Sequence, residues 1–223
     1  MLKEKKIFIL AVPTIIVIII FIIGVSAIFY NRNFKKMSRD DVKSLAQKVA
    51  LIDNISCEIV TKSSEDSVSD VISDYKLKDD KLISEIGSFR IYDNKNEQVL
   101  IQIDDAEKKA YVYSEYNSEI DDFRAMICSA EKLIENDSFE YEFKEYTTVN
   151  GIKCVNFVLK SSDVSYNIWL DRSSGMIVEM KCEFFSESGE DISNTLYFRY
   201  QLDSVADDIV KKPDLSGYEI IEL

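Results

Sequence analysis

Residues 7–31 contain no charged side chain, and this run constrains the chain more than any other feature of its sequence. An α-helix rises about 1.5 Å per residue, so the run would extend roughly 37 Å as a helix. That length crosses the hydrocarbon core of a bilayer, which is about 30 Å thick. The alternative is a cleaved signal peptide, because Val25, Ser26 and Ala27 match the small-residue pattern of a cleavage site. Signal peptides usually have apolar cores of only about 7–15 residues, which favours an uncleaved transmembrane helix.

The apolar run divides the chain into four expected parts. We expect a short tail over residues 1–6, a transmembrane anchor over 7–30, a juxtamembrane linker over 31–37 and a folded domain over 38–223. Basic residues flank the anchor on both sides, and their count weakly favours the second flank inside the cell. They are Lys3, Lys5 and Lys6 before the run, and Arg32, Lys35, Lys36, Arg39 and Lys43 after it. The residues alone therefore leave the side of the membrane open.

Composition excludes several classes of function. The chain has no histidine, which removes Ser-His-Asp and Cys-His catalysis and histidine-ligated zinc. Its 40 acidic and 27 basic residues give a net charge of −13, and such a charge disfavours binding to nucleic acid. The four cysteines form no C-x-x-C motif of the kind found in thioredoxins and zinc ribbons. We therefore expect no enzyme, no cofactor and no metal site.

Two segments have the pattern of amphipathic helices. Ser38 is followed three residues later by Asp41, a capping pair, and apolar residues then recur at helical spacing as far as residue 52. Ser118 and Asp121 form a second capping pair, which predicts a helix over 118–135. The apolar stripe of this second helix is wide, so the helix must cover an apolar surface.

Most of the remaining chain alternates apolar and polar residues with the period of two that is typical of β-strands. Short polar turns, among them Asn150-Gly151, separate these segments and predict antiparallel meanders. The sequence therefore predicts an α+β fold, a strongly curved antiparallel sheet with two helices against its concave face. The expected strands cover residues 55–59, 71–77, 82–86, 89–92, 99–103, 110–113, 139–146, 152–160, 166–171, 176–185 and 195–202.

Five short segments of the last third resemble a known family. They read VNGIKCV (149–155), IWLD (168–171), SGMIV (174–178), YQLDSV (200–205) and PDLSGY (213–218). The pattern is similar to the carboxy-terminal half of LolA-like proteins of Gram-positive bacteria. These envelope proteins are related to the outer-membrane lipoprotein carrier and to the sensor domain of the RseB/MucB group. The resemblance implies an incomplete β-barrel, closed by helices around an apolar cavity, on the outer side of the cell membrane. It thereby implies that residues 1–6 form a cytoplasmic tail and residues 38–223 an extracytoplasmic domain.

The resemblance also implies a function. We expect a single-pass, membrane-anchored extracytoplasmic domain that binds a lipid or lipoprotein in its cavity without catalysing a reaction. The alternative is a protein-interaction or envelope-stress sensing module that acts through a membrane protein partner. Apolar residues at period two also suit an ordinary core, so the sequence cannot separate lining from core. The candidate lining residues are Phe123, Ile127, Val155, Phe157, Leu159, Val178, Met180, Phe184, Leu196 and Phe198.

The remaining chemistry of the sequence is open to two readings. Cys57, Cys128, Cys154 and Cys182 suit either disulfides in an oxidising exterior or buried small hydrophobic residues. Four acidic doublets, at 79–80, 104–105, 121–122 and 207–208, suit a solvated surface far better than a calcium site or a glycosidase pair, because none has the spacing of a calcium loop.

Overall fold

The computed structural model describes residues 36–64, 69–185 and 192–223, and residues Ser38–Leu223 form one compact unit. The predicted tail, the predicted anchor and most of the predicted linker lie outside the described residues. Among the helices that are described, none combines the length and the apolar character needed to cross a bilayer.

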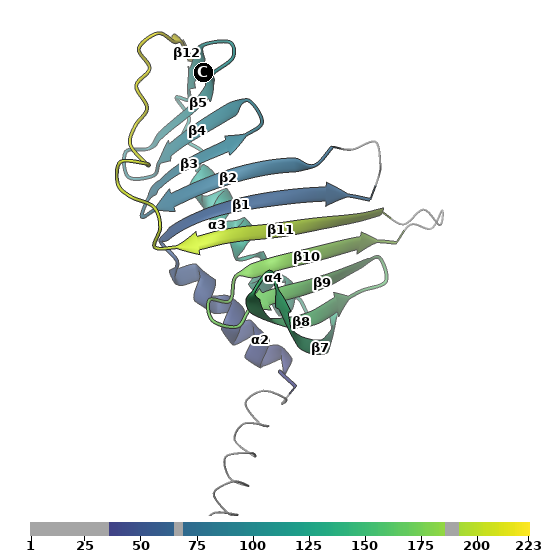
Figure 1. The fold of residues 1–223 in the computed structure, drawn as a ribbon. Coiled ribbons are helices and arrows are strands. Elements are labelled where there is room, and N and C mark those ends of the chain that lie inside the picture. The colour runs from purple at the N-terminus through teal and green to yellow at the C-terminus, as the bar shows by residue number, and fades with distance from the viewer. Residues whose placement is uncertain (1–35, 65–68, 186–191) are drawn as a thin grey trace, which may run out of the picture. The chain divides into compact units, whose positions relative to one another are not determined.

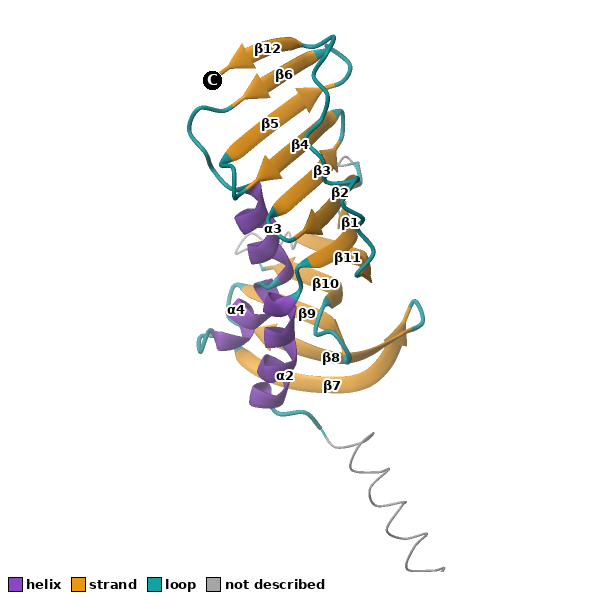
Figure 2. Cartoon of the chain, turned by 90° about the vertical axis from the view of Figure 1, so that its left-hand side faces the viewer, coloured by secondary structure: helices purple, strands orange, loops and turns teal. Residues whose placement is uncertain are grey.

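Twelve strands form one curved sheet that does not close (Figures 1 and 2). Two antiparallel meanders, β1–β6 and β7–β11, are joined where β1 pairs with β11 along most of its length. The C-terminal strand β12 was not predicted, and it pairs with β6 in parallel. The order across the sheet is β12-β6-β5-β4-β3-β2-β1-β11-β10-β9-β8-β7, so β12 and β7 are its outer strands.

Every strand that was predicted from alternation is present in this sheet. The first meander contains β1 (Asn54–Ser63), β2 (Val71–Lys78), β3 (Lys81–Ile86), β4 (Phe89–Asn94), β5 (Val99–Asp104) and β6 (Lys109–Val112). The second contains β7 (Glu140–Val149), β8 (Ile152–Lys160), β9 (Val164–Asp171), β10 (Ile177–Phe184) and β11 (Ile192–Leu202), and β12 covers Glu219–Glu222. The predicted antiparallel, strongly curved sheet is confirmed.

The three α-helices of the described residues lie on one face of the sheet, which we call the inner face (Figure 2). Helix α2 (Arg39–Ala46) has the predicted capping box between Ser38 and Asp41, and it continues as a 3-10 turn over Gln47–Leu51. The prediction of a single helix over 118–135 was wrong. The chain forms α3 (Glu119–Ile127) and α4 (Ser129–Glu135), because the backbone leaves the helical conformation at Cys128 with φ −88° and ψ 4°.

The opposite, outer face of the first meander has a small core of its own. Tyr92, Ile101, Ile103 and Ala110 are all buried there, each with at most 2% of its surface exposed. Leu215 and the ring of Tyr218 pack against this cluster. The C-terminal segment thus covers the outer face before it ends as strand β12, which explains how a four-residue parallel strand is held at the edge of the sheet.

Candidate functional site

The ten predicted lining residues lie mainly in the packed interior. Eight of them are at most 9% exposed, and they lie on α3, β8, β10 and β11. These eight are Phe123, Ile127, Val155, Phe157, Leu159, Val178, Met180 and Phe198. Leu196 is partly buried, and Phe184 is 45% exposed. That these residues line a ligand cavity stays a prediction, and Phe184 is the one that solvent reaches most freely.

Strand register groups Phe184 with further apolar residues on the inner face. Ile192 of β11, Phe184 of β10 and Val164 of β9 are direct neighbours in the ladder. Leu196 lies four residues beyond Ile192 on the same face of β11 and pairs with Met180. Phe184 and Ile192 are 45% and 41% exposed, whereas Met180 is only 9% exposed. We call Val164, Phe184, Ile192 and Leu196 the open inner face.

The helices cover only the opposite end of these strands. In Figure 1 the ends of β1, β2, β10 and β11 that adjoin the grey loops extend past α2, α3 and α4. The covered end is tightly packed, because the ring of Phe123 on α3 stacks on Tyr75 of β2 with 4.6 Å between centroids. An exposed apolar patch on a sheet face that a helix would normally cover is a candidate binding surface.

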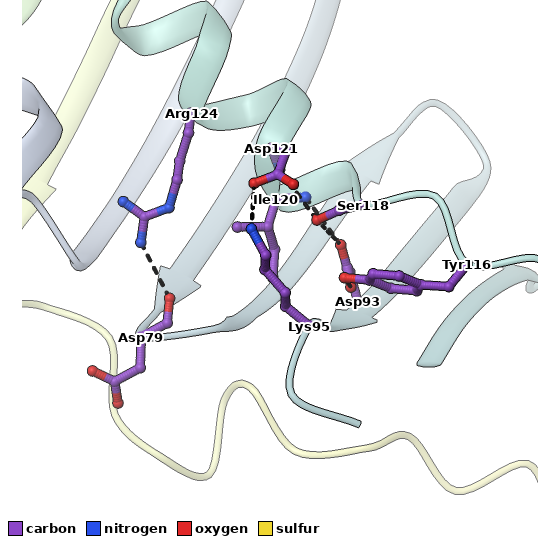
Figure 3. Close-up of polar contacts among 8 residues, drawn as sticks. All are labelled: Asp79, Asp93, Lys95, Tyr116, Ser118, Ile120, Asp121 and Arg124. Atoms are coloured by element: carbon purple, nitrogen blue, oxygen red, sulfur yellow. Dashed lines mark hydrogen bonds and ion pairs between the residues drawn. The ribbon is translucent and has the colours of Figure 1, made fainter. Parts of the chain in front are cut away.

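A buried carboxylate fixes the start of α3 (Figure 3). Asp93 of β4 is fully buried, and its Oδ1 accepts a hydrogen bond from the Tyr116 hydroxyl at 2.8 Å. Its Oδ2 accepts from the backbone N–H of Ile120 at 3.0 Å and from the Ser118 hydroxyl at 3.3 Å. A carboxylate at this position also interacts favourably with the positive end of the helix dipole. Asp93 therefore fixes the position of α3 over the covered half of the inner face.

Two arginines attach the helices to neighbouring segments through hydrogen bonds to backbone carbonyl oxygens. Arg124 of α3 donates to the carbonyl oxygens of Ile52 at 3.1 Å and of Asp79 at 3.3 Å, and the second of these bonds is drawn in Figure 3. Arg39 of α2 donates to three carbonyl oxygens at the end of α4, those of Ile134, Asn136 and Phe139. Ile134 lies in the last turn of α4, whose carbonyl groups have no partner within the helix, so the bond from Arg39 satisfies one of them.

The cysteines have the environment of buried hydrophobic residues. All four thiols are free, and Cys57, Cys154 and Cys182 are buried. Burial raises the pKa of the Cys57 thiol to about 12 and that of Cys154 to about 11, so both are protonated at neutral pH. Thiol nucleophiles need the thiolate form, which these positions disfavour.

Carboxylates in the described ranges offer no metal centre either. No group of three acidic, cysteine or histidine side chains within residues 36–64, 69–185 and 192–223 has a geometry that could hold a metal ion. Asp171 accepts hydrogen bonds from Ser173, Ser174 and Tyr200 and thereby fixes the turn between β9 and β10.

Sequence reasoning found part of the open inner face. Phe184 and Leu196 were predicted from alternation, whereas Val164 and Ile192 were not among the candidates. Both start their strands, and Ile192 directly follows a polar stretch, so neither has the apolar neighbours at i−2 that reveal a strand.

No family model and no curated protein matches the sequence. Among solved structures, MucB in complex with MucA(peri) matches with a TM-score of 0.44 and 10% identity over 83% of this chain and 63% of that chain. MucB in the Pseudomonas aeruginosa MucA/MucB complex matches with a TM-score of 0.41 and 12% identity over 82% and 64%. The chain thus spans just under two thirds of these MucB chains.

A shorter neighbour is named as a member of the LolA superfamily. A LolA superfamily protein from Nitrosomonas europaea matches with a TM-score of 0.29 and 11% identity, over 77% of this chain and 97% of that chain. The structural neighbours thus include MucB and a LolA superfamily protein. At such identities and TM-scores the likeness says nothing about ligand or partner, which must be inferred from the surfaces of this chain.

Proposed function

We propose that this protein is a membrane-anchored, extracytoplasmic binding domain that takes up the acyl chain of a lipid or lipoprotein on its open inner face. The observation that carries the proposal is the exposure of Phe184 and Ile192 on a sheet face whose other half is covered by helices. An acyl chain laid along these strands would remove apolar surface from water, at about 25 cal/mol per Å². The resemblance of the last third of the sequence to LolA-like proteins supports the same ligand class.

The surroundings of the open inner face suit a neutral or apolar ligand body. Its four residues are all aliphatic or aromatic, and the adjoining inner-face positions Asn194 and Tyr166 are uncharged. The side chains that alternate with them, such as Lys181 and Glu183, point to the outer face, where those two form an ion pair of 2.6 Å with each other. Apolar lining with a few polar groups is the usual composition of a small-molecule site.

Anchoring through residues 7–30 is part of the proposal. A domain tethered in this way would accept or present a lipid at the membrane surface. Protease added to intact protoplasts tests the placement, because it should degrade the domain over residues 38–223. Full protection of the domain, with degradation only after lysis, would contradict an extracytoplasmic position.

Native mass spectrometry of the full chain, released from a mild detergent, tests the ligand. We expect lipid adducts on the wild-type protein and on Tyr197→Gln, and their loss on Phe184→Gln. Tyr197 is a matched control, because it is an aromatic residue of the neighbouring strand β11 that faces outward, paired with Glu179. Equal adducts on all three proteins would place any bound lipid elsewhere, and an absence of adducts on the wild type would refute acyl-chain binding.

A further inference from the structure

A hollow of about 690 Å³ lies where strand β3 ends beside the first residues of β2. Its size falls within the range of sites that bind ligands in proteins. Four apolar side chains contribute to it, and three of them are conspicuously exposed: Val71 at 49%, Ile72 at 52% and Phe89 at 39%. The full lining is Asp70, Val71, Ile72, Asp74, Glu85, Ile86, Gly87, Ser88 and Phe89.

A short backbone edge borders this hollow. The pairing of β2 with β3 ends at Ser73 opposite Ile86, whereas the pairing of β2 with β1 continues as far as Val71. Within the described chain, Val71 and Ile72 therefore have a neighbouring strand on one side only. Unpaired strand edges bind extended peptides, which add main-chain hydrogen bonds to the sheet and place alternate side chains in pockets.

The charge around the hollow is negative and poorly compensated. Asp74 and Glu85 are direct neighbours across β2 and β3, and Glu58 is the direct neighbour of Asp74 on the other side. Glu58 is bonded to Arg199 at 2.5 Å, whereas neither Asp74 nor Glu85 forms an ion pair with any described residue. Like charges directly opposite each other destabilise a sheet, so a bound cation would relieve this repulsion.

Arg90 lies next to Glu85 in the ladder but does not neutralise it. Its guanidinium is bonded instead to Asp105, at 3.4 Å. Asp70, at the rim of the hollow, is the only one of the three lining carboxylates with a basic partner, Lys62 at 3.1 Å. Two of the three lining carboxylates are thus available to a cationic partner.

From these features we infer that the hollow binds an extended segment of a partner protein that carries an apolar residue flanked by lysine or arginine. Val71 and Phe89 lie on the inner face of the sheet, whereas Asp74 and Glu85 lie on the outer face. Successive side chains of an extended segment point to opposite faces. The apolar residue would therefore contact Val71 and Phe89, and the basic residues beside it would pair with Asp74 and Glu85. Anionic lipid headgroups are disfavoured, because they would meet like charge. A metal ion is disfavoured as well, since the described carboxylates form no group that could hold one. The inference goes beyond acyl-chain binding and does not depend on it.

Selection from a library of random seven-residue peptides displayed on phage tests the inference. Selections on the full chain in nonionic detergent run in parallel with the double variant Asp74→Asn/Glu85→Gln. The control is Glu140→Gln/Glu145→Gln, two exposed residues of the outer strand β7 that form no ion pair with described residues. Both variants change the net charge by the same amount, so they separate the hollow from non-specific attraction to an acidic protein.

We expect peptides with Lys or Arg beside an apolar residue to be enriched on the wild type and on the β7 control. The best of them, measured by fluorescence anisotropy, should bind Asp74→Asn/Glu85→Gln at least tenfold more weakly and the control less than twofold more weakly. Thermal unfolding of each variant verifies that it is folded. Absence of this enrichment, or equal weakening in both variants, would overturn the inference, while leaving the lipid proposal to its own test at Phe184.

Discussion

Replacing Asp93 with asparagine should destabilise the domain far more than the same replacement of an exposed aspartate at the start of α3. Asp93 is fully buried and accepts three hydrogen bonds, from Tyr116, Ser118 and the backbone of Ile120. Asparagine keeps one acceptor oxygen but presents an amide donor where the other two donors arrive. Hydrogen bonds to charged groups contribute about 1.5–3 kcal/mol each, and a buried donor without a partner costs about 1–3 kcal/mol. We therefore expect Asp93→Asn to lower the free energy of unfolding by about 3 kcal/mol.

Asp121 provides the matched control, because it also lies at the start of α3 (Figure 3). It pairs with Lys95 at 2.7 Å, but the two side chains are 56% and 44% exposed. Exposed ion pairs contribute at most about 1 kcal/mol, so Asp121→Asn should have a small effect.

The assay for both variants is thermal unfolding of the full chain in detergent, followed by far-UV circular dichroism and by the fluorescence of Trp169, the single tryptophan. For a domain of this size, 3 kcal/mol corresponds to a fall in Tm of about 6–12 °C. Equal shifts for Asp93→Asn and Asp121→Asn would refute the argument that Asp93 fixes α3.

Three further predictions concern the turns and the thiols. Gly175→Ala should lower Tm far more than Gly217→Ala. Both glycines have positive φ, but only at Gly175 would an added Cβ meet the backbone, 2.0 Å from the carbonyl oxygen of Leu45 in α2. Similar Tm values for the two variants would contradict this. Burial alone would raise the pKa of Asp171, but hydrogen bonds outweigh burial and hold the pKa below its usual value. Asp171→Asn should therefore lose stability at pH 7, by urea unfolding, and the loss should shrink as the pH falls below about 4; a loss that is constant with pH would count against it. In the native protein at pH 8, Cys128 should react with a thiol reagent before Cys57, whose pKa is about 12; faster modification of Cys57, mapped by mass spectrometry, would show that it is not buried.

The strands were predictable because burial on one face imposes a period of two on the sequence. The alternation of buried and partly buried residues in β1 follows this rule directly. The pairing of β1 with β11 was not predictable, because it joins segments more than 130 residues apart and leaves no local signal. The parallel strand β12 was missed for a similar reason, since only four residues form it and Leu215 and Tyr218 hold it from outside the strand.

The helix break and the role of Arg39 show where local patterns mislead. Apolar residues continue at helical spacing from Ile120 to Ile134, and neither glycine nor proline marks the break at Cys128. Arg39 counted as one of the basic residues that flank the apolar run, but it binds three carbonyl oxygens at the end of α4. Its contacts are made by tertiary structure, so its bearing on membrane orientation is weaker than a count of charges implies.

The candidate site was predictable in composition but not in position. Alternation identified Phe184 and Leu196 as candidate lining residues together with six strand residues that are buried in the core, and helical spacing added Phe123 and Ile127, which are buried as well. Which part of an apolar face remains uncovered depends on where α2, α3 and α4 dock, and contacts such as Asp93 with Ile120 determine that docking. Nothing in the local sequence around Phe184 reports those contacts.

Photocrosslinking at single positions tests acyl-chain binding on the open inner face most directly. A benzophenone amino acid in place of Phe184, in the full chain in cells fed an alkyne-labelled fatty acid, should form lipid-labelled adducts on irradiation. The same amino acid in place of Tyr197, on the outer face, should form few or none. Adducts of equal yield at both positions, or none at Phe184, would contradict the account.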